Sequence, residues 1–167
     1  MDAGYNILVI DDDAFMRDAC HQTLTRRGHK VTLAESGRKA LVLLEKWSFD
    51  LILLDLKMPD EDGLFVLARI KDLDPEAMVV MITGHGSIET AVQAIKLGAY
   101  DYSVKPVEIE ELVSKIDKAA RRKRNRDQLI LEVYMKPYST RRERQEQIAK
   151  ILDSSRISSF IATPKKL

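Results

Sequence analysis

Five short, largely apolar runs divide the first 120 residues, and each is followed by a segment with helical periodicity. The runs are residues 7–10, 31–33, 51–54, 78–82 and 102–104. Runs of this length predict strands of a parallel sheet that is covered on both faces. Parallel strands need crossover segments, and right-handed crossovers place helices on both sides of a sheet. The pattern therefore predicts an α/β fold with a doubly wound, five-stranded parallel sheet.

The helical segments carry their own start and stop signals. A helix over residues 13–27 ends at Gly28, which suits the left-handed turn that closes helices, and Gly98 ends another. Ser36 and Ser87 are well placed to cap the N-termini of two helices. Apolar residues spaced three and four apart predict the buried faces. These faces are Leu41 and Leu44; Leu64, Leu67 and Ile70; Ile88, Ala91, Val92 and Ile95; and Ile109, Leu112, Val113 and Ile116.

Four of the predicted strands end in residues that carry chemistry. Asp11 and Asp12 follow the first strand, Asp55 ends the third, Thr83 ends the fourth, and Lys105 follows the fifth. In sheets of this kind, ligands bind beyond the carboxyl ends of the strands, where the strand order reverses. We therefore expect these carboxylates, the hydroxyl and the ammonium to meet in one shallow site.

The residue types predict a magnesium site that handles a phosphoryl group. Carboxylates that lie close together raise one another's pKa unless a cation neutralises them. Mg²⁺ prefers oxygen ligands, takes one or two carboxylates, keeps several waters and binds phosphate. Asp55 ends the most central apolar run and is the natural nucleophile, giving an aspartyl phosphate. Lys105 and Thr83 can then donate to the phosphoryl oxygens.

Each member of the constellation also has an ordinary structural reading. Asp13 directly precedes a helix and is predicted to cap it. Thr83 could serve a turn, and Lys105 followed by Pro106 could be a strand end with a turn. The joint occurrence of these residues at the same ends of consecutive strands favours the functional reading.

Composition narrows the setting. No apolar run approaches the roughly 20 residues needed to span a bilayer, and no basic segment leads into a signal-peptide core. We therefore expect a cytoplasmic protein. The single cysteine, Cys20, lies on an apolar stripe and is predicted to be a small core residue.

Charge divides the chain into two parts. Residues 1–120 carry a net charge of −7 and residues 121–167 a net charge of +8. Such asymmetry predicts two functional pieces, a domain over 1–120 and a basic helical extension over 121–167. The boundary falls inside a basic run in what reads as a continuous helix.

The extension reads as a helical hairpin. Its first helix continues to Met135 and is broken by Pro137, and its second opens with a capping-box pattern over residues 140–143. Ile148, Ile151 and Leu152 share one stripe, whereas residues 154–167 are predicted to be poorly ordered or docked on a partner. A hairpin this small cannot bury its apolar faces alone, so it should pack against a second copy of the chain or back on the first domain. We favour homodimerisation or output through protein contacts. Nucleic-acid binding by the basic run is not favoured, because its charges encircle the helix.

The chain closely resembles the receiver domain of bacterial two-component response regulators over residues 5–120. The resemblance is carried by Asp11-Asp12, by Asp55 with Met58-Pro59 and Asp62-Gly63, by Thr83-Gly84 and by Lys105-Pro106. It implies a flavodoxin-like sheet with strand order 2-1-3-4-5, phosphorylation of Asp55 by a histidine kinase, and a cis bond before Pro106. It also implies that Mg²⁺ is held by Asp11, Asp12, Asp55 and the backbone carbonyl of Lys57.

The resemblance further implies a switch and leaves the output open. Thr83 and Tyr102 match the family's switch residues, and Tyr102 would remodel the face made by the fourth helix, fifth strand and fifth helix. Lys57 and His85 occupy variable positions that can tune the phosphoryl lifetime. The motifs in residues 83–91 and 98–102 are similar to those of nitrogen-regulation-type transcription activators. The extension could therefore be a linker left when an output domain was removed, or a natural replacement for that output domain. A phosphatase or other hydrolase is disfavoured, because the length leaves no room for a cap domain.

Overall fold

The computed structural model describes residues 4–84, 87–137 and 139–161, without the side chains of Ile109 and residues 155–161. The chain separates into two compact units, Met1–Ala120 and Arg121–Leu167. Each unit is described by itself below. Among the described segments, every helix is too short or too polar to span a lipid bilayer.

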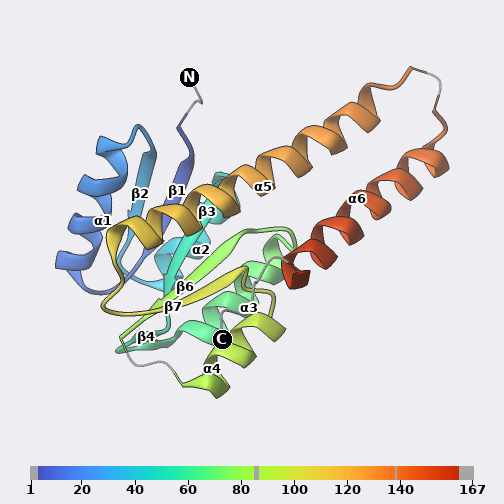
Figure 1. Ribbon diagram of the computed structural model, residues 1–167. Coiled ribbons are helices and arrows are strands. Elements are labelled where there is room, and N and C mark those ends of the chain that lie inside the picture. Colours follow the sequence, from blue (N-terminus) through green and yellow to red (C-terminus); the bar gives the residue numbers. More distant parts are fainter. Residues whose placement is uncertain (1–3, 85–86, 138, 162–167) are drawn as a thin grey trace. The chain divides into compact units, whose positions relative to one another are not determined.

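The first unit is built on one parallel sheet (Figure 1). Its strands are β1 (Asn6–Ile10), β2 (Lys30–Ala34), β3 (Leu51–Asp55), β6 (Val79–Thr83) and β7 (Asp101–Val104). They are arranged in the order β2-β1-β3-β6-β7, and all neighbouring pairs are parallel. Numbered among themselves, the five strands have the order 2-1-3-4-5, which confirms the predicted fold class. The strand order reverses between β1 and β3, and the candidate functional site lies next to this reversal.

Helices follow the strands with the predicted caps. They are α1 (Ala14–Arg26), α2 (Gly37–Lys46), α3 (Gly63–Leu73), α4 (Ile88–Lys96) and α5 (Ile109–Met135). The side chains of Ser36 and Ser87 accept backbone N–H groups of the first turns of α2 and α4. Gly28 and Gly98 have φ values of 87° and 100°, the left-handed conformation that glycine adopts without steric cost.

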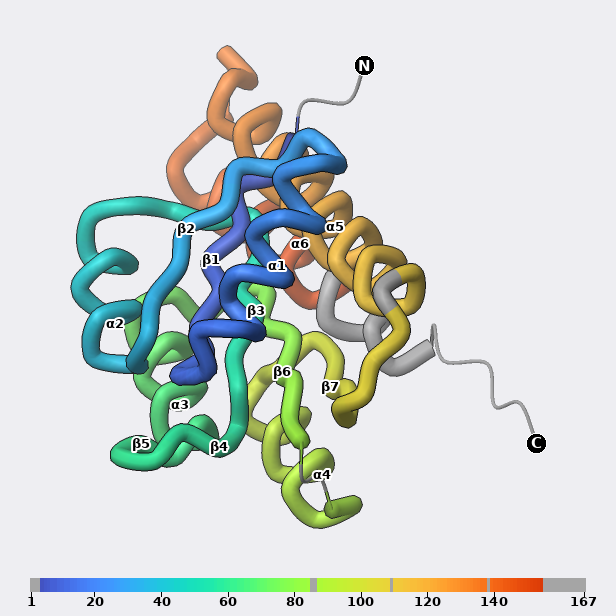
Figure 2. The backbone as a smooth tube through the Cα atoms, turned by 90° about the vertical axis from the view of Figure 1, so that its left-hand side faces the viewer, coloured from blue at the N-terminus to red at the C-terminus, as the bar shows by residue number. Residues whose placement is uncertain are grey.

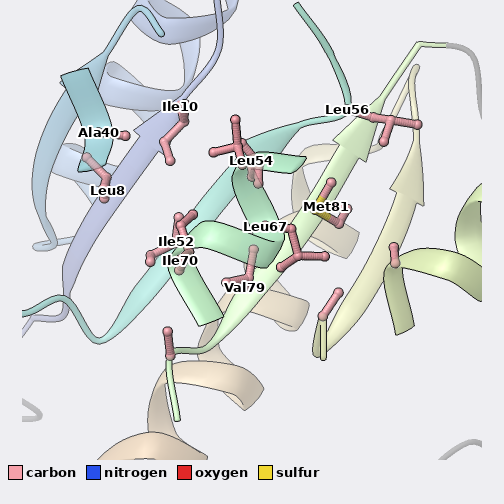
Figure 3. Close-up of a cluster of buried hydrophobic side chains, with 14 of the residues drawn as sticks. Leu8, Ile10, Ala40, Ile52, Leu54, Leu56, Leu67, Ile70, Val79 and Met81 are labelled. Atoms are coloured by element: carbon pink, nitrogen blue, oxygen red, sulfur yellow. The ribbon is translucent and has the colours of Figure 1, made fainter. Parts of the chain in front are cut away.

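The sheet is covered on both faces because successive strand side chains point to opposite sides. Leu8 and Ile10 of β1 pack with residues of α2, α3 and α4, whereas Ile7 and Val9 pack with residues of α1 and α5. Figure 2 shows α2 and α3 on one side of the sheet and α5 on the other. Figure 3 shows the first of these clusters, with Leu8, Ile52 and Met81 among its labelled side chains. Cys20 is buried in the second cluster, as predicted.

Two features of this unit differ from the sequence prediction. The apolar stripe of α4 faces outward: Ile88, Val92 and Ile95 are exposed, with Ile88 at 85% of its surface. Ala94 faces the core instead and is fully buried in the first cluster. The segment after β3 also forms a small antiparallel hairpin of β4 (Lys57–Met58) and β5 (Glu61–Asp62). Strands of two residues are too short to produce a hydrophobic period.

The second unit contains the distal part of α5 and the helix α6 (Arg141–Ile161). The predicted capping box is present: Thr140 N–H donates to Glu143 Oε2 at 2.7 Å, and Glu143 N–H donates to Thr140 Oγ1 at 3.2 Å. The Thr140 N–H and the Thr140 hydroxyl both donate to Glu143 Oε2, and these two hydrogen bonds lower the pKa of Glu143. Helix α6 continues to Ile161, while residues 162–167, which belong to the segment predicted to be poorly ordered or docked on a partner, lie outside the described part.

Candidate functional site

The polar residues singled out in the sequence lie at one edge of the sheet. Asp11 and Asp12 follow β1, Asp55 is the last residue of β3, and Thr83 is the last residue of β6. Lys105 follows β7 directly. Since all five strands run in parallel, their carboxyl ends meet at this edge, next to the reversal of strand order between β1 and β3.

Three carboxylates form the centre of the site. Asp11, Asp12 and Asp55 each offer an oxygen atom, and these oxygens all lie within 4.8 Å of one another. Asp11 and Asp55 are buried, whereas Asp12 is exposed. Negative charges this close repel one another, so the arrangement favours any cation that can join it.

Lys105 supplies one cation from the chain itself. Its Nζ lies 3.0 Å from Asp11 Oδ2 and 3.8 Å from Asp55 Oδ2. Burial lowers the pKa of Lys105, but the hydrogen bond that its ammonium donates to Asp11 and the charges of Asp11 and Asp55 outweigh this effect, so the pKa is raised above its ordinary value. The Lys105–Pro106 bond is cis, as the resemblance predicts. The ammonium therefore remains charged and faces the acidic cluster.

Asp55 is the most strongly perturbed acid. Burial and the charge of Asp11 raise the pKa of Asp55 to about 6, against opposing effects of Lys105 and of the Lys57 amide. That amide donates to Asp55 Oδ1 at 3.3 Å. A carboxylate that is costly to ionise and lies beside a cation is typical of functional sites.

The switch candidates lie along β6 and β7. Thr83 is fully buried, and its carbonyl accepts the Lys105 N–H at 2.6 Å. Tyr102 is half-buried, and its hydroxyl lies 3.3 Å from Thr90 Oγ1 in the first turn of α4. Thr83 and Tyr102 thus occupy neighbouring strands, with Met81 paired to Tyr102 and Thr83 paired to Val104. His85 lies outside the described residues.

The loop that carries Asp11 and Asp12 is held by further hydrogen bonds. Asp11 Oδ1 accepts the Asp13 N–H at 2.9 Å, and Asp13 Oδ1 accepts the Phe15 N–H at 2.9 Å. Asp13 is therefore the predicted helix cap. Arg17 Nη1 donates to the carbonyls of Asp11 and Asp12 at 2.8 and 2.9 Å. The sequence prediction did not include Arg17. The only sequence feature that could have indicated its role is its position on the first turns of the helix that follows the acidic pair.

A second missed residue, Glu61, joins the hairpin to a helix. Its Oε1 accepts the Arg38 N–H at 3.0 Å, and its Oε2 accepts the Gly37 N–H. The carboxylate thus binds the N-terminal turn of α2, where orphan donors and the positive end of the helix dipole favour an anion. Because Glu61 is distant from α2 in sequence, no local pattern predicts this contact.

The donor set fits Mg²⁺. All three groups are oxygen ligands, and one of them, Asp12, is exposed, which leaves room for the waters that this ion retains. Among the residues that the structure describes, no sulfur or imidazole ligand belongs to the cluster, so this donor set does not match a site of the zinc type. The acidic cluster is thus typical of a Mg²⁺ site with open positions.

Comparison with known proteins identifies the family. The sequence profile described as "Response regulator receiver domain" matches residues 7–117. The chain belongs to the response regulator receiver family, whose members are phosphorylation-dependent signalling switches of two-component systems rather than enzymes. The acidic cluster of Asp11, Asp12 and Asp55 is its phosphorylation-type pocket.

Similar proteins include receivers attached to larger chains. The transcriptional regulatory protein ZraR of Escherichia coli (strain K12) is 41% identical over 114 residues, which are 68% of this chain and 26% of that protein. The crystal structure of NtrX from Brucella abortus is 36% identical, with a TM-score of 0.71, and covers 78% of this chain and 30% of NtrX. The solution structure of the beryllofluoride-activated NtrC4 receiver domain dimer is 36% identical, with a TM-score of 0.67, over 71% of this chain and 98% of that receiver. This chain therefore spans about a quarter of ZraR.

Proposed function

We propose that this protein is a response regulator that accepts a phosphoryl group from a sensor histidine kinase on Asp55, with Mg²⁺ bound by Asp11, Asp12, Asp55 and the Lys57 carbonyl. The observation that carries the proposal is the convergence of three carboxylate oxygens within 4.8 Å, with the Lys105 ammonium 3.8 Å from Asp55. Receiver domains partner with histidine kinases, which supports the choice of phosphodonor.

The chemistry follows from the positions of the side chains. A carboxylate oxygen of Asp55 attacks the phosphorus, a P–O bond forms, and the P–N bond to the kinase histidine breaks with its electron pair leaving on nitrogen. Lys105 and the Thr83 hydroxyl then donate to the phosphoryl oxygens. Bound Mg²⁺ would neutralise negative charge on the carboxylates and on the transferring group.

Phosphorylation would act as a switch by changing local charge. The new group adds roughly −1.5 to −2 charge, which draws Thr83 and Lys105 towards it. Tyr102 follows Thr83 and remodels the face of α4, β7 and α5. The exposed side chains of Ile88, Val92 and Val104 make this face suited to protein contacts.

Phosphorylation can be tested with a small phosphodonor. Incubation with phosphoramidate and Mg²⁺ should add one phosphoryl group to the intact mass. Chelation of Mg²⁺ should abolish the addition, and so should the Asp55→Asn substitution. Asp62→Asn serves as a matched control, because Asp62 caps α3 and lies outside the acidic cluster. Equal phosphorylation of Asp55→Asn and the unmodified chain would refute the proposed acceptor.

The extension is proposed to form a homodimer. In the distal part of α5, Leu129, Leu131, Tyr134 and Met135 are exposed, while Ile148, Ile151 and Leu152 of α6 are half-buried. Solution mass of the full chain and of a version ending at Ala120, each with and without beryllofluoride, tests this directly. A dimer that needs residues 121–167 supports the proposal, and a monomeric full chain refutes it.

A second candidate is a fragment or variant of a transcription regulator that acts through DNA or another output partner. The relative ZraR is named a transcriptional regulatory protein, and this chain matches 26% of its length. The net charge of +8 in residues 121–167 would favour DNA contacts. Salt-dependent DNA binding that disappears with the extension would support this candidate over the dimer.

A further inference from the structure

The guanidinium of Arg17 donates its hydrogen bonds to backbone carbonyls, and its charge also helps to lower the pKa of Glu35. Its Nη1 donates to the carbonyl oxygens of Asp11 and Asp12, at 2.8 and 2.9 Å. Within the described residues, Arg17 forms no ion pair. One planar nitrogen with two N–H groups thus spans two consecutive peptide units.

Those two peptide units belong to Asp11 and Asp12, whose carboxylates are proposed to bind the metal but are not held equally by hydrogen bonds. Asp11 is fixed through its carboxylate, which accepts the Asp13 N–H at 2.9 Å and the Lys105 ammonium at 3.0 Å. The carboxylate of Asp12 is exposed, and no hydrogen bond or ion pair holds it among the residues that the structure describes. The position of Asp12 therefore depends on its backbone, and the side chain that donates a hydrogen bond to this backbone is Arg17.

The loop needs such support because its charges repel one another. Three carboxylate oxygens lie within 4.8 Å, and the Lys105 ammonium offsets only part of their charge, so repulsion favours spreading of the loop until a further cation binds. Arg17 itself is anchored on α1, where its N–H donates to the carbonyl of Asp13 at 3.0 Å. The contact therefore ties the acidic loop to a rigid helix.

We propose that Arg17 is a positioning residue that preorganises the Asp11–Asp12 loop for Mg²⁺. The inference rests on the proposed function, since it assumes that Mg²⁺ binds at the acidic cluster. Residues that orient metal ligands without touching the ion commonly affect metal affinity by tenfold or more.

Whether Mg²⁺ binds more weakly or more tightly when Arg17 is replaced distinguishes a positioning role from a purely electrostatic one. By Coulomb's law, removing a cation beside a metal site strengthens the binding of Mg²⁺. Losing the hydrogen bonds from Arg17 to the loop weakens the binding of Mg²⁺, because the loop must then be ordered when the ion binds. Arg17→Gln removes both the charge and the bidentate grip, so weaker binding identifies the positioning role.

Isothermal titration calorimetry with MgCl₂ on the unphosphorylated full chain at pH 8 provides the test. We expect the dissociation constant of Arg17→Gln to rise about tenfold. Arg17→Lys, which keeps the charge but reaches the two carbonyls less well, should lie between. Arg26→Gln removes the same charge from the last turn of the same helix and should bind as the unmodified chain does.

Each possible result either supports or overturns the proposed role of Arg17. Unchanged or tighter binding by Arg17→Gln, or equal weakening by Arg26→Gln, overturns the role of Arg17 while leaving the metal site intact. An unmodified chain that binds no Mg²⁺ overturns the metal site itself and this inference with it. If circular dichroism shows that Arg17→Gln does not fold, Arg17→Lys decides: weaker binding supports the role, and unchanged binding refutes it.

Discussion

The Tyr102 hydroxyl of β7 lies 3.3 Å from the Thr90 hydroxyl of α4. Thr90 also completes the capping box of α4: its N–H donates to Ser87 Oγ at 3.1 Å, and its Oγ1 accepts the Ser87 N–H at 3.0 Å. The side chain proposed to move on phosphorylation is therefore hydrogen-bonded to a capping-box residue in the first turn of the neighbouring helix. Movement of Tyr102 would change the cap of α4 directly.

A double-mutant cycle of Thr90→Val and Tyr102→Phe tests this contact. Each substitution removes one hydroxyl with little change in shape, and the coupling in the free energy of unfolding should be about 0.5–1 kcal/mol. The cycle isolates the contact, since the loss of the cap is common to Thr90→Val in both backgrounds. Additive effects on urea denaturation would show that the two hydroxyls are not coupled.

Asp55 should make stability depend on pH in the absence of metal. Its folded-state pKa is raised from 3.8 to about 6, so the ionised form is penalised in the fold. The penalty begins as pH rises through the unfolded-state value and is complete above the folded-state value. Asp55→Asn carries no such charge. With a chelator present, it should be more stable than the unmodified chain by about 1 kcal/mol above pH 6, after allowance for solvent screening.

The difference between the two chains should shrink as pH falls from 6 towards 4. Urea denaturation at several pH values measures it, and Asp62→Asn, at an exposed cap, gives the matched control. A constant difference across this range would mean that Asp55 is not perturbed by burial and by Asp11.

Gly63 lets α3 approach the backbone that follows Asp55. A Cβ at this position would lie 2.5 Å from the Asp55 carbonyl oxygen and 2.6 Å from Leu56 Cα. Because these are backbone atoms, Gly63→Ala should force α3 away from the site and cost about 1–3 kcal/mol of stability. Gly84→Ala, whose Cβ would meet no atom of the described residues within 4 Å, is the control. Equal melting temperatures for the two variants would contradict this packing.

Much of the fold and the site could be predicted from local patterns. Continuous apolar strands, helix caps such as Ser36 and Asp13, and the helix-ending Gly28 are signals contained within a few residues. The proximity of Asp11, Asp55 and Lys105 could be predicted because parallel strands end at one edge of the sheet. The cis bond before Pro106 came from the family resemblance alone.

The remaining features depend on tertiary packing. The outward face of α4 looks like an ordinary buried stripe in the sequence, and only the close packing of Ala94 shows otherwise. Contacts such as Glu61 with the N-terminus of α2 join distant segments without a periodic signal. The helical course of residues 154–161 overrides the weak helix propensity of their serines.

Chemical trapping of the phosphorylated residue tests the central claim most directly. The full chain is phosphorylated with phosphoramidate and Mg²⁺ and then reduced with borohydride, which converts an aspartyl phosphate to homoserine. Peptide mapping by mass spectrometry should place homoserine at position 55 alone. Homoserine at another aspartate, or none despite a phosphorylated intact mass, would contradict the assignment of Asp55 as the acceptor.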